Sequence, residues 1–186
     1  MRRVILFIAS SLDGYIARKN GGIDWLFSDG DYGYRKFYDS VDCVLVGRKT
    51  YETAVNLGER FLGKDCYVFS RSKPSSHAKN VHFERDPVGL TKRLAAERGK
   101  GIFLEGGGET ITTFLNAELV DEIVLSIHPL VLGDGIPPFA NVKQQINLKL
   151  LGSTRYASGL VQLRYKVLKI AKKAHDVVHI SERLRH

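Results

Sequence analysis

The chain has 186 residues, of which 44% are hydrophobic and 26% are charged, a composition typical of one soluble globular domain. No apolar run approaches the roughly 20 residues that span a bilayer, so we expect no membrane as a partner. The formal net charge is +8, but residues 164–186 hold seven of the 28 basic and only two of the 20 acidic residues, and a basic tail without a basic, aromatic-rich face disfavours nucleic acid as a partner.

Apolar β-branched runs and amphipathic stretches alternate along the chain. In chain order they predict a buried strand over 3–9, a long polar loop over 10–29, a helix over 31–40 capped by Ser28, a strand over 42–46, a helix over 49–56, a strand over 65–70, a turn over 72–76, a short strand over 81–83, a helix over 88–98, a strand over 101–105, a helix over 109–117, a strand over 122–128 and a second long loop over 128–141.

The C-terminal part of the chain changes pattern. Residues 147–155 and 160–168 flank a turn and predict a hairpin. The alternation over 161–167 is typical of a strand with one solvated face at the edge of a sheet. The whole order predicts an α/β three-layer fold whose mostly parallel central sheet ends in an antiparallel hairpin. We expect one domain over 1–169 and a basic C-terminal tail over 170–186.

Two glycine turns carry the strongest functional signal. They are Gly47-Arg48-Lys49-Thr50 and Gly106-Gly107-Gly108-Glu109-Thr110, and each follows a predicted strand and opens a predicted helix. Such a turn leaves backbone N–H groups unpaired at the positive end of the helix dipole, where phosphate binds. The two turns therefore predict a dinucleotide held at two points.

The second turn departs from the Rossmann fingerprint, which needs a third glycine and an acid at the end of the next strand. Ile111 occupies the third glycine position, and the next strand ends at Ser126-Ile127-His128. Another candidate anion site, Ser70-Arg71-Ser72, follows the third strand. Arg48 and Arg71 together would hold a 2′-phosphate, which favours NADP(H) over NAD(H).

Five segments in this order resemble the dihydrofolate reductase-like superfamily, and most closely its branch containing the reductase domain of the bifunctional riboflavin-biosynthesis deaminase-reductase. They are Ser11-Leu12-Asp13-Gly14-Tyr15-Ile16-Ala17, Gly47-Arg48-Lys49-Thr50-Tyr51-Glu52, Phe69-Ser70-Arg71, Glu105-Gly106-Gly107-Gly108-Glu109 and Pro129-Leu130-Val131-Leu132-Gly133-Asp134-Gly135-Ile136-Pro137. The resemblance spans residues 4 to about 168.

The resemblance implies NADPH bound in extended form across the strand ends. Ala9 and Ile16 would flank the nicotinamide. Gly47 to Thr50 would hold phosphates on one side, and Ser70 and Arg71 would border the 2′-phosphate. Gly107 to Thr110 would hold the pyrophosphate, and Asp134 matches a loop acid near the cofactor. Relatives of this kind also imply a homodimer.

The substrate end is less determined. Folate reductases place one carboxylate on the first helix, and alignment here leaves Asp31 and Asp29 as candidates, with Asp13 third and Trp25 as a residue lining the substrate slot. A shielded carboxyl with a raised pKa would polarise the heterocycle or relay a proton. Both Asp29 and Asp31 are also ordinary acidic residues at a helix start. The aspartate-asparagine-proline segment of the riboflavin branch is missing, so neither relative fixes the substrate.

We therefore predict an NADPH-dependent reductase of a pteridine- or pyrimidine-like heterocycle. Two alternatives stay open: a nucleotide-binding regulatory module without turnover, and nucleic-acid binding through the basic tail. No metal is expected, because the histidines lack metal-ligand spacing apart from the pair His175 and His179. Cys43 and Cys66 lie in apolar runs without CxxC spacing, which predicts buried free thiols and a cytoplasmic location.

Overall fold

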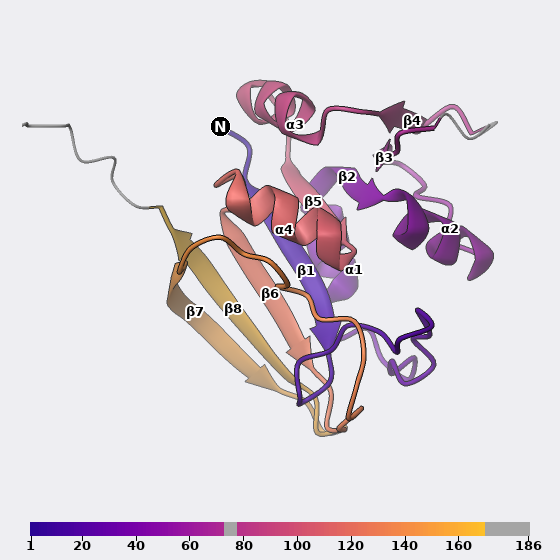
Figure 1. Cartoon of the computed structure of the whole chain (residues 1–186), viewed down its shortest axis with the longest axis vertical. Coiled ribbons are helices and arrows are strands. Elements are labelled where there is room, and N and C mark those ends of the chain that lie inside the picture. The colour runs from indigo at the N-terminus through magenta and orange to yellow at the C-terminus, as the bar shows by residue number, and fades with distance from the viewer. Residues whose placement is uncertain (73–77, 170–186) are drawn as a thin grey trace, which may run out of the picture.

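A computed structural model describes residues 1–72 and 78–169 and contains one mixed sheet with helices on both faces (Figure 1). The strands are β1 (Val4–Ser10), β2 (Val41–Gly47), β3 (Asp65–Phe69), β4 (Val81–Glu84), β5 (Gly101–Gly106), β6 (Glu122–Ile127), β7 (Asn147–Arg155) and β8 (Val161–Leu168). The helices are α1 (Tyr34–Asp39), α2 (Arg48–Asn56), α3 (Pro87–Ala96) and α4 (Gly108–Asn116).

The strand order is β4-β3-β2-β5-β1-β6-β8-β7. Strands β1 to β6 pair in parallel, whereas β8 pairs antiparallel with both β6 and β7. The predicted α/β fold with a C-terminal antiparallel hairpin is confirmed. The parallel arrangement brings the carboxyl ends of β1, β2, β3 and β5, and the loops that follow them, to one edge of the sheet.

The hairpin corrects one prediction. Strand β8 is not at the edge of the sheet, because β7 lies outside it and is exposed along its whole length. The predicted solvated face of β8 is present, because Arg164 and Lys166 are exposed whereas Val167 is buried. There the Arg164 guanidinium binds the carboxylate of Glu122 on the neighbouring strand, with Nη2 2.6 Å from Oε2.

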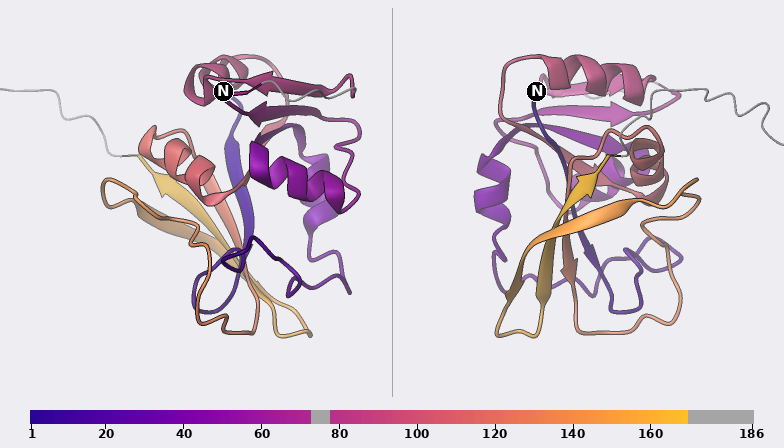
Figure 2. Two further views of the ribbon diagram at one scale, coloured as in Figure 1. Left: turned by 45° about the vertical axis from the view of Figure 1, so that its right-hand side comes forward. Right: turned by 90° about the vertical axis from the view of Figure 1, so that its left-hand side faces the viewer.

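Helices lie on both faces of the sheet (Figure 2), and each face has its own hydrophobic core. On one face, Phe37 of α1 and Tyr51 of α2 pack against buried Val44, Val46 and Phe103. On the other face, the buried side chains include Leu90 and Leu94 of α3 and Ile111 and Phe114 of α4, packed with Leu6, Leu45 and Leu104. These two layers of helices are the outer layers of the predicted three-layer fold, with α1 and α2 together on one side.

Helix α1 begins three residues later than predicted and is not capped by Ser28. Tyr32 and Gly33 have positive φ angles of 48° and 77°, and this left-handed pair keeps the chain out of the helix until Tyr34. Asp31 takes over part of the capping role, because its Oδ1 accepts the Arg35 N–H at 3.0 Å.

Helix α3 begins and ends earlier than predicted, since Asp86 caps it through the Gly89 N–H and Pro87 occupies its first position.

Part of the predicted organisation lies outside the described residues. This applies to the tail over 170–186 with its His175 and His179, and to most of the turn over 72–76.

Within residues 1–72 and 78–169, no helix is both long and apolar enough to cross a membrane. In the same residues, no cluster of three or more His, Cys, Asp or Glu side chains could hold a metal ion. Cys43 and Cys66 are buried free thiols, as predicted.

Candidate active site

The two glycine turns lie side by side because β2 and β5 are hydrogen-bonded neighbours, with Val46 opposite Gly106. They also interlock. The Gly107 N–H donates to Oγ1 of Thr50 at 3.0 Å, and a Cβ at Gly47 would lie only 2.5 Å from Oγ1 of Thr110. Each turn thus places a threonine hydroxyl against a glycine of the other.

This contact explains why so many glycines are needed. Gly106 has a φ of 118°, which side chains rarely permit, and a Cβ at Gly108 would lie 2.7 Å from the Pro137 carbonyl oxygen. The glycines therefore serve the close packing of two turns and a loop. The same packing holds the starts of α2 and α4 next to each other.

Both helix starts leave their first-turn N–H groups without a side-chain cap. The N-cap residues are Gly47 for α2 and Gly107 for α4, neither of which makes a side-chain cap bond. Helix α3, which follows β4, differs in having the Asp86 cap. Uncapped N–H groups at the positive end of a helix are what an anionic group such as phosphate needs. The residues present thus fit the phosphates of a dinucleotide.

Cationic side chains stand beside the turns. Arg48 is half-exposed and pairs with Glu52 one helical turn away, Nη1 to Oε1, at 3.1 Å. Lys49 and Arg71 are exposed. Ser70 and Ser72 lie with their hydroxyl oxygens 3.3 Å apart, just after β3. Since Gly47 pairs with Phe69 across β2 and β3, Arg48 and Arg71 follow adjacent strand ends, as a shared anion site requires.

The two long loops are joined to each other beside the end of β1, which includes Ala9. Ile16 donates its N–H to Ile136 O, and Ala17 O accepts the Ile136 N–H, both at 2.8 Å. The Asp13 carboxylate accepts the N–H groups of Leu132 at 3.1 Å and Gly133 at 2.8 Å. Hydrogen bonds from the Ser11 side chain and from these amides lower the pKa of Asp13. The ionised carboxylate of Asp13 thus holds the second long loop in place.

Asp134 has a similar structural role, because its carboxylate forms an ion pair with Lys19 of the first loop. The Lys19 ammonium lowers the pKa of Asp134. The two predicted helix-one acids are also engaged and exposed: Asp29 accepts the Tyr32 hydroxyl at 2.6 Å, and Asp31 accepts the Arg35 N–H. The shielded carboxyl that the sequence analysis sought is therefore neither Asp29 nor Asp31.

Trp25 is buried and meets His128 edge-on, with ring centroids 5.2 Å apart. His128 follows β6, and its Nε2 accepts the Phe27 N–H at 3.3 Å. Burial lowers the pKa of His128, so the imidazole is neutral at pH 7. Trp25 thus packs in a small aromatic cluster, in which its Nε1 and the Nδ1 of His128 are buried without hydrogen-bond partners.

A cleft of about 600 Å³ lies beside the glycine turns. Its lining residues come from α1, α2, the loop over 57–62, Ile23 of the first long loop, and Glu105 at the end of β5. Thr50 of the first glycine turn lines it, and Glu105 is followed directly by Gly106 of the second. Asp13, Trp25, Asp29 and Asp31 do not line it.

Glu105 is the shielded carboxyl group of this site. Its Oε2 is buried and has no hydrogen-bond partner. Burial, and then the negative charge of Glu59, raise the pKa of Glu105 to about 8. The buried hydroxyl of Tyr38, also without a partner, lines the same cleft. Glu105 begins one of the segments that carry the family resemblance but was not among the predicted site residues. The available signal was an acid at the end of an otherwise apolar strand.

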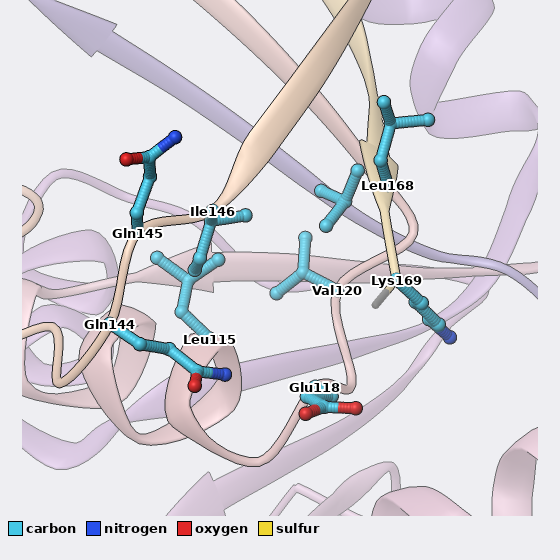
Figure 3. A pocket seen from close by; sticks show the side chains of 9 residues that line it. Leu115, Glu118, Val120, Gln144, Gln145, Ile146, Leu168 and Lys169 are labelled. Carbon is cyan, nitrogen blue, oxygen red and sulfur yellow. The ribbon is translucent and has the colours of Figure 1, made fainter. Parts of the chain in front are cut away.

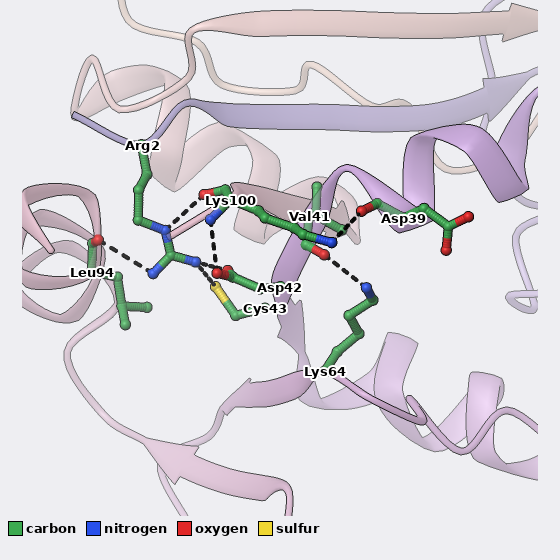
Figure 4. A network of polar contacts seen from close by, with 8 residues as sticks. All are labelled: Arg2, Asp39, Val41, Asp42, Cys43, Lys64, Leu94 and Lys100. Carbon is green, nitrogen blue, oxygen red and sulfur yellow. Dashed lines mark hydrogen bonds and ion pairs between the residues drawn. The ribbon is translucent and has the colours of Figure 1, made fainter. Parts of the chain in front are cut away.

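Two other polar or hollow regions do not belong to this site. A cavity of about 30 Å³ lies between the end of α4, the segment 144–146 that precedes β7, and the end of β8; its lining includes Leu115, Val120 and Leu168 (Figure 3). It has room for about two water molecules. At the amino ends of the strands, Arg2 is held by polar groups of α3, β2 and Lys100 (Figure 4).

Comparison with known proteins gives the family. The family model described as the RibD C-terminal domain matches residues 2–162. The chain belongs to the RibD C-terminal domain family. The resemblance identified from the sequence is thereby confirmed, and with it the reductase-like fold of a riboflavin-biosynthesis domain.

Individual relatives of this RibD C-terminal domain are similar to it over most of its length. The uncharacterized protein YyaP of Bacillus subtilis is 40% identical over 177 residues, covering 88% of this chain and 94% of YyaP. A structure of a protein assigned to riboflavin biosynthesis from Shewanella sp. PV-4 has a TM-score of 0.79 and 28% identity, covering 90% of this chain and 99% of that one. A pyrimidine reductase-like protein from Corynebacterium diphtheriae shares the fold, with a TM-score of 0.68 at 17% identity and coverage of 91% and 93%.

Proposed function

We propose that this RibD C-terminal domain is an NADPH-dependent reductase that transfers a hydride to a pteridine- or pyrimidine-like heterocycle. The observation that carries the proposal is the juxtaposition of an anion-binding edge and a cleft with a shielded acid. Glu105 lines the cleft, and the next residue, Gly106, begins the glycine turn that opens α4. Family membership supports the same reductase class.

The cofactor would occupy the edge formed by the two glycine turns. Gly47, Arg48, Lys49 and Thr50 would hold phosphate on one side, and the segment 106–110, including Glu109, would hold the pyrophosphate on the other. Ser70, Arg71 and Ser72 would border the 2′-phosphate that distinguishes NADPH from NADH. Ala9 and Ile16 would flank the nicotinamide, near the loop that Asp134 stabilises. When bound, NADPH supplies the hydride.

Reduction of a C=N bond also requires a proton at the nitrogen. Because the pKa of Glu105 is raised to about 8, this side chain is mostly protonated at pH 7 and can donate a hydrogen bond or a proton to a ring nitrogen. The surrounding cleft shields the reacting groups from water. We therefore assign the acid role to Glu105 ahead of Asp31, Asp29 and Asp13. Trp25 would then support the loops rather than contact the substrate.

Two further properties belong to the proposal. The family resemblance implies a homodimer, and the pair of buried thiols fits a reducing cytoplasm. Size-exclusion chromatography with light scattering tests the first, since a monomer at micromolar concentration would contradict it.

The function itself is tested in two steps. First, NADPH and NADH are titrated against the purified chain, with nicotinamide fluorescence as the signal. We expect NADPH to bind at least about tenfold more tightly, because only NADPH carries the 2′-phosphate. Second, oxidised pterins and pyrimidines are screened for loss of NADPH absorbance. Absence of NADPH binding would overturn the proposal, and binding without turnover of any heterocycle would favour a regulatory module.

A further inference from the structure

The mouth of the cleft is apolar. Leu57 and Leu62 line it and are 70% and 78% exposed. Both belong to the loop that follows α2, and Ala54 and Ile23 line the cleft with them. We call these four residues the apolar mouth. Two large aliphatic side chains exposed at the rim of one cleft indicate a ligand part that covers them, because burying apolar surface is favourable.

The inner end of the cleft is polar. Glu105 and Tyr38 both line the cleft, and each has a buried oxygen without a hydrogen-bond partner. A protonated carboxyl group both donates and accepts a hydrogen bond, and a phenol does the same. Adjacent donor and acceptor atoms, such as those of a lactam or amidine edge on a heterocycle, would satisfy both groups.

The charges around the cleft are unfavourable for a phosphate. Glu59 and Glu105 both line it, and Glu59 holds the loop by accepting the N–H groups of Arg60 at 2.8 Å and Phe61 at 2.6 Å. Among the described residues that line the cleft, Arg60 is the one cation. Its guanidinium is exposed and donates to Glu59 O at 3.2 Å. A phosphate dianion would meet a carboxylate there and little compensating charge.

We propose that the cleft takes a flat nitrogen heterocycle carrying an uncharged apolar or aromatic substituent. The polar edge of the ring faces Glu105 and Tyr38, and the substituent lies against Leu57 and Leu62. This inference rests on the proposed reductase function and narrows its substrate class. It separates this chain from enzymes whose heterocyclic substrates carry a phosphorylated sugar.

The test compares three pterins with the same ring: unsubstituted pterin, 6-benzylpterin and 6-hydroxymethylpterin phosphate. Affinities are measured by quenching of pterin fluorescence, with and without NADPH. We expect the benzyl compound to bind about tenfold more tightly than the bare ring, and the phosphate to bind more weakly than the bare ring. The double variant Leu57→Ser, Leu62→Ser should lose most of the benzyl advantage while binding the bare ring as before.

Leu150→Ser is the matched control, because Leu150 is 52% exposed on β7 and does not line the cleft. It should leave all three affinities unchanged. Tighter binding of the phosphate than of the bare ring, an unaffected benzyl advantage in the double variant, or binding of none of the pterins overturns the inference. Because NADPH binding is measured separately, its absence identifies a failure of the proposed reductase function instead.

Discussion

The amino ends and the carboxyl ends of the same parallel strands are built in opposite ways. At the amino ends, the guanidinium of Arg2 pairs with Asp42 and donates to Lys100 O at 2.8 Å and to Cys43 Sγ at 3.3 Å (Figure 4). At the carboxyl ends, α2 and α4 begin without side-chain caps. The Glu105 carboxyl group, just before α4, has a buried oxygen without a partner.

This difference suits the amino edge of the sheet to stabilising the fold and the carboxyl edge to binding a ligand. A buried polar atom without a partner costs about 1–3 kcal/mol. Near Arg2, the Asp42 carboxylate has an ion pair with the guanidinium and accepts the Lys100 N–H at 2.8 Å, although its Oδ1 makes no hydrogen bond. At the other edge, the buried Glu105 oxygen has neither an ion pair nor a hydrogen bond, and on the proposed function a ligand would satisfy it. The comparison predicts that substitutions at the carboxyl edge impair binding and turnover, whereas substitutions at the amino edge impair folding.

The largest effect is expected for Glu105→Gln. The variant keeps the shape of the side chain but removes its acidic proton, so turnover should fall about 100-fold or more, while the NADPH dissociation constant stays within about twofold. Steady-state NADPH oxidation and nicotinamide fluorescence measure the two quantities. Glu97→Gln, on the exposed end of α3, is the control. Full turnover in Glu105→Gln would remove this residue from the mechanism.

The next largest effect is expected for Gly108→Ala. The new Cβ would lie 2.7 Å from the Pro137 carbonyl oxygen, and this backbone atom cannot move without displacing the loop. NADPH binding should weaken by about tenfold or more. Gly152→Ala is the control, because the space around that residue is open. Equal affinities of the two variants would mean that the second glycine turn does not contact the cofactor.

At the opposite edge, Arg2→Ala should destabilise the fold without altering the site. The Arg2 side chain is 7% exposed and that of Asp42 is 38% exposed, so loss of the pair should lower the free energy of unfolding by about 2 kcal/mol. Urea denaturation measures this change. The NADPH affinity of the folded variant should equal that of the parent chain, and a weaker affinity would show that the two edges are coupled.

A smaller and more selective effect is expected for Arg71→Ala and Arg48→Ala. Each removes a cation from the predicted 2′-phosphate site, so NADPH should bind about tenfold more weakly while NADH binding changes less than about twofold. Arg93→Ala on the exposed side of α3 controls for net charge. Equal loss for both cofactors would place the 2′-phosphate elsewhere.

The last expected effect concerns stability alone and is a pH dependence due to Glu105. Its pKa is raised from 4.5 to about 8 in the folded chain, so between these values the folded state keeps a proton that the unfolded state has released. Stability should therefore fall as pH rises through this window. Glu105→Gln should lack this slope, with a relative change in Tm on the order of 10 °C between pH 5 and pH 8. If Tm changed with pH in the same way in Glu105→Gln and in the parent chain, the raised pKa of Glu105 would be contradicted.

The cofactor edge was more predictable from sequence than the substrate end. Strand-turn-helix order located both glycine turns, because glycines and β-branched runs act locally. The interlocking of Thr50 with Gly107 and of Thr110 with Gly47 depends on β2 and β5 being neighbours. That pairing joins segments far apart in the sequence and has no local signal.

The exposure of the two predicted acids could not be read from the sequence for a similar reason. Asp31 and Asp29 were selected by position along the chain, but the left-handed conformations of Tyr32 and Gly33 shorten α1 and leave both acids exposed. Glu105 is shielded only because α1, α2 and the loop over 57–62 close around the end of β5. Burial of this kind follows from tertiary packing, which no spacing of residues in the sequence reveals.

The reciprocal threonine contacts between the glycine turns have a consequence for binding kinetics. Because each turn is fixed by a side chain of the other, the two helix starts form one prebuilt surface before any ligand arrives. On the proposed function, a dinucleotide would then lose little conformational entropy on binding and would not wait for a loop to close over its phosphates. Its association rate should follow the ionic strength of the medium rather than the motion of the chain, as for a charged ligand steered onto a rigid basic edge.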